Sequence, residues 1–345
     1  MSKEYAYKYN NGVLVFGYED NAYKPYKYYE LRRKFERLYG KQELPEIEIY
    51  TTTPYIDLET HEVIKTIGYH EKYKLLMMQD FSDLNLEPYE NLEEVKQAID
   101  FLTSFIDFVY PTNQEAQNEL LAHLICSCSG ASLFKRPPLI VSRECSPTYC
   151  DMDLVKAVGA VIYCVHTGND FCPFLCHSGS ALIMDLKCFL SSYKTSGVLI
   201  VRQIDKAIDF LNEVICDDQY SVRSFRKENL VKRQNKNLIV LVFLNHKKEI
   251  KNEAGFSHFR IKCVNEKKIV KYWSFRLNDD IVSVHSYLDH VLEHRKQIIE
   301  KGVRLVLWWL KNRDKFAISS TYDKNNEHLY LIRDMLDSLR SIPQS

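Results

Sequence analysis

The feature that most constrains the fold is a series of continuous apolar runs between residues 138 and 245. The runs PLIVS, GVLIV and NLIVLVFLN are separated by segments with helical periodicity, such as DLVKAVGAVIYCV and AIDFLNEVI. Strands that are apolar throughout are typical of parallel sheets, which helices cover on both faces. The sequence therefore predicts an α/β fold with a mainly parallel sheet, and ligands of such sheets bind at the carboxyl ends of the strands.

The segment that precedes this region predicts a different kind of structure. Residues 1–75 are irregular and β-rich, with an apolar strand at 12–16 and period-two alternation at 46–58. Between these strands, the segment YKYYELRRKFERLYG resembles a short amphipathic helix that ends at Gly40. A β-rich region is therefore expected before the α/β core.

Residues 91–134 have the periodicity of helices. Asn91 is placed to cap the first helix, Pro111 interrupts the pattern, and a second helix ends near Gly130. Near the other end of the chain, VRLVLWWLKN predicts a helix whose tryptophans belong to the core, with a stacking platform as the less favoured alternative. We therefore divide the chain into a β-rich N-terminal region (1–90), a small helical domain (91–136), the α/β core (137–262) and a mixed, helical C-terminal region (263–345).

Composition excludes several classes of protein. The chain has 345 residues, 46 Lys and Arg against 46 Asp and Glu, and 46% hydrophobic residues, which is typical of a folded globular protein. Zero net charge argues against a wholly basic nucleic-acid coat or an acidic tail protein, although it permits a local basic patch. No apolar run approaches 18 residues, and the polar, tyrosine-rich N-terminus lacks the apolar segment of a secretory signal. We expect an intracellular protein with no membrane partner.

The ten cysteines are expected to be free thiols that pack as small hydrophobic side chains. One cluster, consisting of Cys164, His166, Cys172, Cys176 and His177, offers soft ligands for zinc. Structural zinc sites usually pair two short knuckles at a distance, whereas these residues all lie within fourteen positions. No metal site is therefore predicted.

The strand ends lack the residues that bind nucleotides. A phosphate loop after PLIVS requires glycines, a lysine and a hydroxyl residue, but the segment SRECSPTYCD has neither glycine nor lysine and contains Pro147. After GVLIV, where an ATPase carries two acidic residues, the chain has Arg202 and Gln203. The third strand leads to Asn245, which is either a γ-phosphate sensor or a turn residue.

The order of these parts resembles a known family. The succession TTTPYIDLETHEVIK, FIDFVYPTNQEAQNELLAHLICSCSG, PLIVS, GVLIVRQID, NLIVLVFLNH and VRLVLWWLKN is similar to the viral superfamily 3 helicases. More narrowly, it is similar to the ATPase portion of the poxvirus-type primase-helicases of large DNA viruses, over about residues 50–316. The resemblance implies an AAA+-like core, assembled as a ring, that moves along DNA with ATP and magnesium.

Carried onto this chain, the family's motifs are largely lost. The phosphate-loop positions fall on Ser142 to Tyr149, which include Arg143, and the acidic pair falls on Arg202 and Gln203. Asn245 matches the sensor asparagine, and Arg260 falls near the arginine finger. We therefore predict a degenerate nucleotide site, no catalytic residues and no cofactor, although the family uses ATP and magnesium.

A basic stretch lies between residues 223 and 251, where nine cations face two acids. In the resembled helicases this region includes a hairpin that faces the DNA channel, and Tyr220 and Phe225 are available to stack on bases. A solvated loop with ordinary surface lysines is the alternative. The predicted DNA-binding residues are Arg223, Arg226, Lys227, Lys232, Arg233 and Lys236.

Three functions remain open from the sequence. The first is a catalytically inactive helicase-like protein, in the host cytoplasm or nucleus, that binds DNA or assists ring assembly in viral DNA replication. Its partners would be DNA, further copies of itself, or a helicase or other replication protein. The second is a protein-interaction scaffold that uses the tyrosine-rich N-terminus, itself either a partner-binding arm or a solvated strand edge, or the cysteine-rich surface. The third is an atypical ATPase in which Lys156 or Lys206 replaces the missing lysine.

Overall fold

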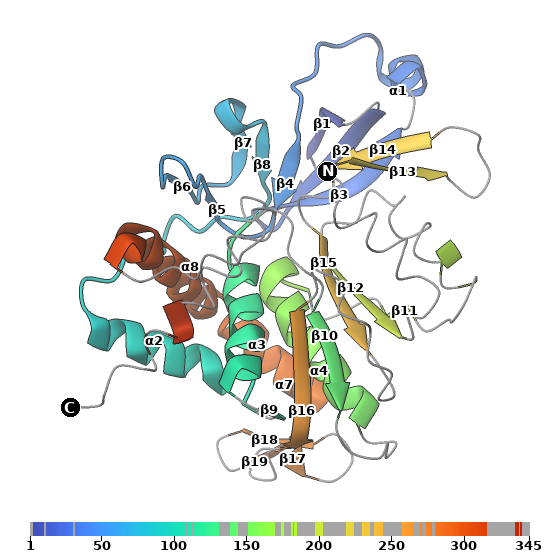
Figure 1. Ribbon diagram of the computed structural model, residues 1–345. Helices are drawn as coiled ribbons and strands as arrows, with labels where there is room; N and C mark the ends of the chain where they lie inside the picture. The colour runs from blue at the N-terminus through green and yellow to red at the C-terminus, as the bar shows by residue number, and fades with distance from the viewer. Residues whose placement is uncertain are drawn as a thin grey trace.

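The computed structural model shows a mixed α/β protein (Figure 1). None of the helices in the described part of the chain is both long and apolar enough to cross a membrane. The residues that the structure describes are 3–9, 12–29, 32–107, 109–111, 114–130, 139–143, 151–169, 174–175, 181, 183–184, 197–202, 219–223, 230–234, 238–243, 257–264, 269–270, 274–277, 280–315, 335–337 and 339.

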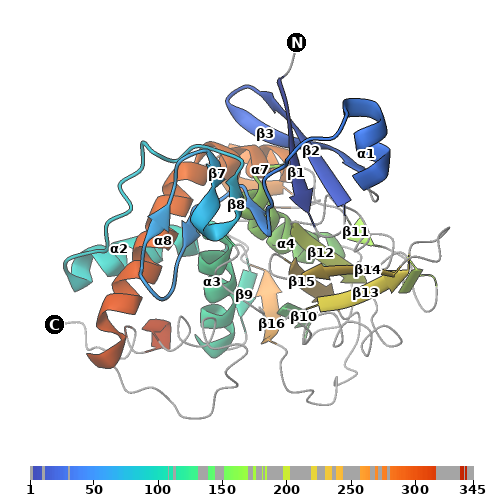
Figure 2. The same ribbon diagram turned by 90° about the horizontal axis from the view of Figure 1, so that it is seen from above.

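A small antiparallel sheet and the short helix that follows it form the N-terminal end of the molecule (Figures 1 and 2). Its strands, in the order β1-β2-β3, are β1 (Lys3–Tyr9), β2 (Gly12–Glu19) and β3 (Ala22–Tyr29). Asp20 and Asn21 join β2 to β3 with positive φ angles of 51° and 57°, as a type I′ hairpin turn requires. Helix α1 (Arg32–Tyr39) follows, and Gly40 ends it with φ 77°.

The helix predicted from YKYYELRRKFERLYG therefore begins later than expected. Tyr28 and Tyr29 pair with Leu14 and Val13 in the sheet, so the tyrosine-rich half of that segment belongs to β3. Alternating aromatic residues suit a pleated strand better than a helix. Only the basic half, from Arg32 onward, forms a helix.

Several of the N-terminal tyrosines pack against one another and are buried or half-buried. Tyr7 is 5% exposed and its ring lies 5.8 Å from that of Phe16, while Tyr9 contacts Tyr50 at 5.5 Å between ring centroids. Burial is the largest cause that raises the pKa of the Tyr7 hydroxyl above its usual value. Part of the tyrosine-rich N-terminus therefore forms a small aromatic core, whereas Tyr26 is exposed, and the role of this segment in binding a partner stays a prediction.

Short strands connect this end to the rest of the molecule. They form a three-stranded sheet in the order β4-β8-β7 and a two-stranded sheet β5-β6. The predicted strand at 46–58 is thus divided into β4 and β5. Between them, the buried Thr51 hydroxyl donates a hydrogen bond to the Thr53 carbonyl and accepts one from the Thr53 amide, and this local turn interrupts the strand. The elements are β4 (Ile49–Thr51), β5 (Tyr55–Ile56), β6 (Val63–Ile64), β7 (Gly68–His70), η1 (Glu71–Tyr73) and β8 (Leu75–Met77).

The central sheet has six strands in the order β11-β12-β15-β10-β16-β9. The pairs from β11 to β16 are parallel, and β9 joins β16 antiparallel at one edge. The strands predicted from PLIVS, GVLIV and NLIVLVFLN are therefore confirmed as neighbouring or next-neighbouring strands of one sheet. Their bounds are β9 (Val109–Pro111), β10 (Leu139–Arg143), β11 (Phe174–Leu175), β12 (Gly197–Arg202), β15 (Leu238–Phe243) and β16 (Ser257–Val264).

Two further antiparallel units complete the described strands. A hairpin, β13 (Gln219–Arg223) and β14 (Leu230–Gln234), precedes β15, and a three-stranded meander follows β16. The meander consists of β17 (Ile269–Val270), β18 (Ser274–Leu277) and β19 (Asp280–Ser283).

The helices share one apolar core with the N-terminal loops. Asn91 caps α2 as predicted, because its side chain accepts a hydrogen bond of 2.9 Å from the Glu94 amide. Trp309 is 2% exposed and the predicted tryptophan pair is confirmed as core. The helices are α2 (Leu92–Ser104), α3 (Gln114–Ser127), α4 (Asp151–Thr167), α7 (Val284–Glu293) and α8 (Arg295–Asn312), and η2 (Arg313–Lys315) follows.

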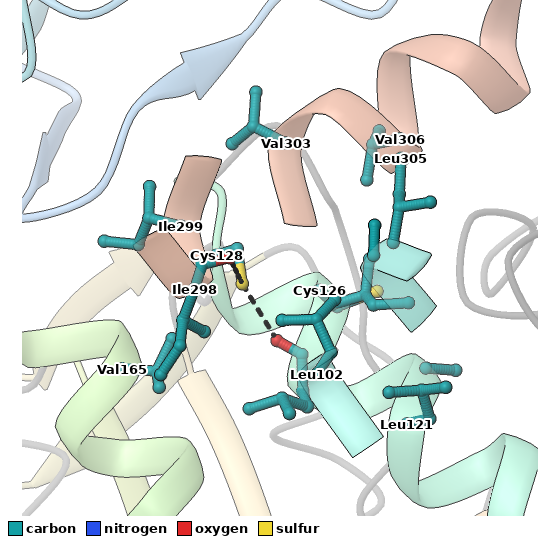
Figure 3. Packing of buried hydrophobic residues seen from close by; sticks show 14 of the residues in the cluster. Leu102, Leu121, Cys126, Cys128, Val165, Ile298, Ile299, Val303, Leu305 and Val306 are labelled. Carbon is teal, nitrogen blue, oxygen red and sulfur yellow. Dashed lines mark hydrogen bonds between the residues drawn. The ribbon is translucent and has the colours of Figure 1, made fainter. Parts of the chain in front are cut away.

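The end of α3 packs closely against α8 (Figure 3). A Cβ atom added to Gly302 would lie 2.5 Å from the Cys128 sulfur, so only glycine permits this approach. The Cys128 thiol lies 3.5 Å from the Ile298 carbonyl oxygen and 3.4 Å from that of Leu124. Cys126, Cys128 and Cys164 are buried free thiols, as expected of small hydrophobic side chains.

A buried arginine at the start of α8 connects this helix to α4 and to the loops that follow β4 and β8. Arg295 begins α8 and donates hydrogen bonds to the Val165 carbonyl at 2.9 Å, the Gln79 side chain at 2.7 Å and the Thr52 carbonyl at 2.6 Å. The Val165 and His166 carbonyls lie in the last turn of α4, where the helix dipole is negative. Desolvation lowers the pKa of Arg295 to about 10, so the guanidinium still carries its charge at neutral pH.

Candidate functional site

The carboxyl edge of the central sheet brings together three of the predicted nucleotide-site positions. In the sheet register, Phe243 of β15 pairs with Val141 on one side and with Arg202 on the other. Ser142 and Arg143 therefore extend one and two positions beyond this row, and Arg202 lies two strands away, at about 10 Å. The backbone places the degenerate phosphate-loop strand and the degenerate acidic strand at the same edge.

This edge also contains the point where the strand connections diverge. From β10 the chain runs to β11 at one edge, whereas from β15 it crosses β10 to reach β16 on the other side. Ligands of open parallel sheets bind at such a switch point, outside the carboxyl ends of the two strands. The expected ligand crevice therefore lies beyond Arg143 and Phe243, which are the last residues of β10 and β15.

The residues at this crevice do not fit a nucleotide with magnesium. The segment that follows β10 lacks the glycines and the lysine that wrap and neutralise phosphates. β12 ends in Arg202, a cation, at the position where a carboxylate would hold the metal. Among the residues that the structure describes at this edge, Ser142, Arg143 and Arg202 include no carboxylate that could hold magnesium.

Arg260 lies in the middle of strand β16. Its backbone pairs with Ser142 in the parallel ladder between β16 and β10. An arginine finger acts from a position where it can reach a neighbouring active site. Backbone pairing alone does not test this role, so the assignment of Arg260 stays a prediction.

The basic stretch contains a β-hairpin between β12 and β15, at the place that the resemblance implies. Tyr220 pairs with Arg233, Ser221 with Lys232 and Arg223 with Leu230. The predicted cations Arg223, Lys232 and Arg233 therefore belong to the paired strands of one antiparallel unit. Whether they contact DNA is not tested by this geometry.

The hairpin and the nucleotide-site positions lie at opposite ends of the strands of the central sheet, the hairpin at the amino end of β15 and the nucleotide-site positions at the carboxyl ends. Only three residues separate Gln234, the end of β14, from Leu238, the start of β15, so the hairpin adjoins the amino end of β15. Figure 1 shows the same relation, with the hairpin above β15 and the carboxyl ends of β10 and β15 pointing away from it. The two groups of predicted site residues are therefore not parts of one pocket.

Several predicted site residues lie outside the described part of the chain. They are Tyr149, Gln203 and Asn245 of the degenerate nucleotide site, and Arg226, Lys227 and Lys236 of the basic stretch. Their assignments stay predictions.

A second basic surface lies on β3 and α1 and overlaps the tyrosine-rich N-terminus that the sequence offered as a partner-binding arm. Its aromatic and apolar members are Tyr26, Leu38 and Tyr39, with exposed fractions of 61%, 64% and 42%. The exposed cations of the same two elements and of the turn that follows are Lys24, Lys27, Arg32, Arg33, Lys34, Arg37 and Lys41. Exposed tyrosines among cations are the side chains with which proteins hold single-stranded nucleic acids.

The described members of the candidate zinc cluster at 164–177 serve other roles. Cys164 is fully buried, and the His166 ring nitrogen Nδ1 lies 3.3 Å from the Ser127 carbonyl oxygen. A different group of possible ligands lies at the end of α7, where His290, Glu293 and His294 approach one another. The spacing H-x-x-E-H, an inverted form of the zinc motif H-E-x-x-H, is the sequence signal that could have identified them.

Comparisons with known proteins do not assign a family. No protein-family model matches the chain, and no curated protein matches it. Among solved structures, the chain is similar to the apo A-form structure of the NrS-1 C-terminal region, with 10% identity and a TM-score of 0.42 over 98% of this chain and 72% of that one. A second structure of that region matches with 11% identity and a TM-score of 0.39, over 86% of this chain and 65% of that one. Likenesses at this level carry no argument, so the conclusions below depend on the chain's own geometry.

Proposed function

We propose that this chain is a helicase-like protein with an AAA+-like core of the superfamily 3 type that does not turn over ATP. It would act in viral DNA replication by binding DNA or by assisting ring assembly. The observation that carries this proposal is the combination of a parallel sheet with its switch point between β10 and β15 and a basic hairpin inserted directly before β15. The resembled helicases have the same succession of parts, whereas the nucleotide ligands have been replaced.

DNA binding would be electrostatic and independent of sequence. A plot of log affinity against log salt concentration has a negative slope. Each phosphate that a lysine or arginine neutralises makes this slope steeper by about 0.9 on duplex DNA and by about 0.7 on single strands. The hairpin region and the surface on β3 and α1 are the two candidate contacts. Because the second surface includes exposed tyrosines, it would favour single strands, whose bases can stack.

The test is fluorescence anisotropy of labelled single- and double-stranded DNA over a salt series from about 50 to 200 mM, together with an ATPase assay with and without DNA. Two charge reversals separate the surfaces: K232E/R233E in β14 and R33E/R37E in α1. The matched control is K311E/K315E, which makes the same change of charge at the end of α8, where both lysines are exposed.

We expect no ATP turnover, binding that weakens steeply with salt, and a smaller salt slope for at least one of the two charge reversals but not for the control. Measured ATP hydrolysis would contradict the proposal that this chain has lost ATPase activity, and would favour an atypical ATPase. Absence of binding at low salt would contradict the DNA-binding role. A DNA-indifferent oligomer would then favour an interaction scaffold, with the exposed Tyr26, Leu38 and Tyr39 as its first candidate contact.

A further inference from the structure

The end of α7 carries three potential metal ligands on adjacent turns. The ligand atoms of His290, Glu293 and His294 all lie within 4.8 Å of one another. The two histidines are four residues apart and the glutamate is three residues after the first, so the helix places them on one side. Ligands of a tetrahedral zinc ion are about 3.3 Å apart, given bond lengths of about 2.0–2.1 Å. Small side-chain rotations would therefore close the group around an ion.

The position of His294 leaves its outer nitrogen available to a metal. Its Nδ1 atom donates a hydrogen bond of 2.9 Å to the His290 carbonyl oxygen, which can only accept. The neutral ring therefore carries its proton on Nδ1, and Nε2 keeps the lone pair that binds metals. A backbone carbonyl that fixes the tautomer in this way is the usual second-layer partner of a metal-bound histidine.

Aromatic packing holds both rings before any ion arrives. The His290 ring stacks on Phe105 with 5.7 Å between centroids and an angle of 23° between planes. The His294 ring lies 4.2 Å from that of His290 and 5.9 Å from Phe105. Tyr287, one turn earlier, fixes this contact by donating a hydrogen bond of 3.0 Å to the Phe105 carbonyl. Ligands that packing already orients lose little entropy on binding.

We propose that His290, Glu293 and His294 bind one divalent transition-metal ion, with Zn²⁺ as the best fit. Two imidazoles and a carboxylate favour zinc over magnesium, which prefers oxygen ligands and octahedral geometry. Both histidines are half-buried and Glu293 is exposed, so the three residues occupy one side of the ion and the fourth position faces solvent. Such a site can hold a water molecule or a side chain from a partner. This proposal does not depend on the DNA-binding function.

The test uses the full chain, stripped with chelator and titrated with Zn²⁺ in equilibrium dialysis, with the melting temperature as a second readout. The variants are H290Q, E293Q and H294Q. E293Q changes an exposed residue and should fold normally, so it keeps the test valid if either histidine is needed for packing. The matched control is H285Q, because His285 lies on the same helix with a 72% exposed side chain. Mg²⁺ alone is the comparison metal.

We expect the wild type and H285Q to bind one more zinc equivalent per chain than H290Q or H294Q, and we expect zinc to raise their melting temperatures. E293Q should bind at least about tenfold more weakly, since even the loss of a supporting residue costs 10–100-fold. Co²⁺ at this site should give visible bands without the intense thiolate absorption that the cysteines would produce. Equal zinc stoichiometry in the wild type and H290Q, or an equal loss in H285Q, would overturn the proposal.

Discussion

Replacing Arg295 by methionine tests whether one buried cation holds the core together. The guanidinium makes three hydrogen bonds of 2.6–2.9 Å, to Thr52, Gln79 and Val165, and a longer one to the His166 carbonyl. A hydrogen bond to a charged group contributes about 1.5–3 kcal/mol, and burial of the charge offsets part of the sum. We therefore expect R295M to lower the free energy of unfolding by about 3–4 kcal/mol, which is a large part of the usual 5–15 kcal/mol.

The assay is urea unfolding followed by tryptophan fluorescence, since Trp308 and Trp309 are buried on the same helix. R295K should lose about half as much, because an ammonium can reach the end of α4 but cannot also span to Thr52 and Gln79. The matched control is K296M at the next position, where the lysine pairs with Asp83 at 2.7 Å on an exposed surface. That variant should lose no more than about 1 kcal/mol. A stability of R295M equal to that of K296M would refute the reasoning.

Three further substitutions test local features of the core. G302A should lower the stability by about 1–3 kcal/mol although alanine favours helices, because the new methyl group overlaps Cys128; adding C128A should recover part of the loss, and additive effects of the two changes would contradict a direct clash. Y89F should not destabilise the protein at neutral pH, because the Tyr89 hydroxyl is buried with no hydrogen-bond partner among the described residues. Burial raises the pKa of Tyr89 to about 12, so the wild type loses stability as pH rises from 10 to 12, and the advantage of Y89F in urea unfolding should grow over that window; a constant difference would contradict this. N91A should cost about 1 kcal/mol, as measured by thermal unfolding, since it removes the cap of α2, and N91S should restore most of it.

The strands of the central sheet could be predicted because their environment is uniform. β10, β12 and β15 are inner strands of a mainly parallel sheet, and their sequences contain continuous apolar runs that stand out from the rest of the chain. The cap at Asn91 and the buried Trp309 are likewise local signals. The sheet register places Ser142 one position beyond the row that contains Arg202, at the carboxyl ends of the strands, whereas its assignment to a nucleotide site stays a prediction.

Features that depend on distant partners could not be predicted. The start of α1 was placed too early because Tyr28 and Tyr29 are amphipathic, and only their pairing with β2 shows that they form a strand. Nothing local marks Arg295 as buried, since its acceptors come from segments at least 129 positions away. The roles of the cations on the hairpin stay predictions, because backbone pairing does not show what a side chain contacts.

The strand order of the central sheet also has a consequence for synthesis of the chain. β10 is an inner strand, yet both of its neighbours, β15 and β16, follow it by about 95 and 114 residues. At translation rates of 5–20 residues per second, its apolar run would remain without a strand partner for roughly 5–20 s. During that time the unpaired backbone N–H and C=O groups of this strand can pair with other chains and cause aggregation. A chaperone that covers residues 139–143 would therefore raise the yield of folded protein.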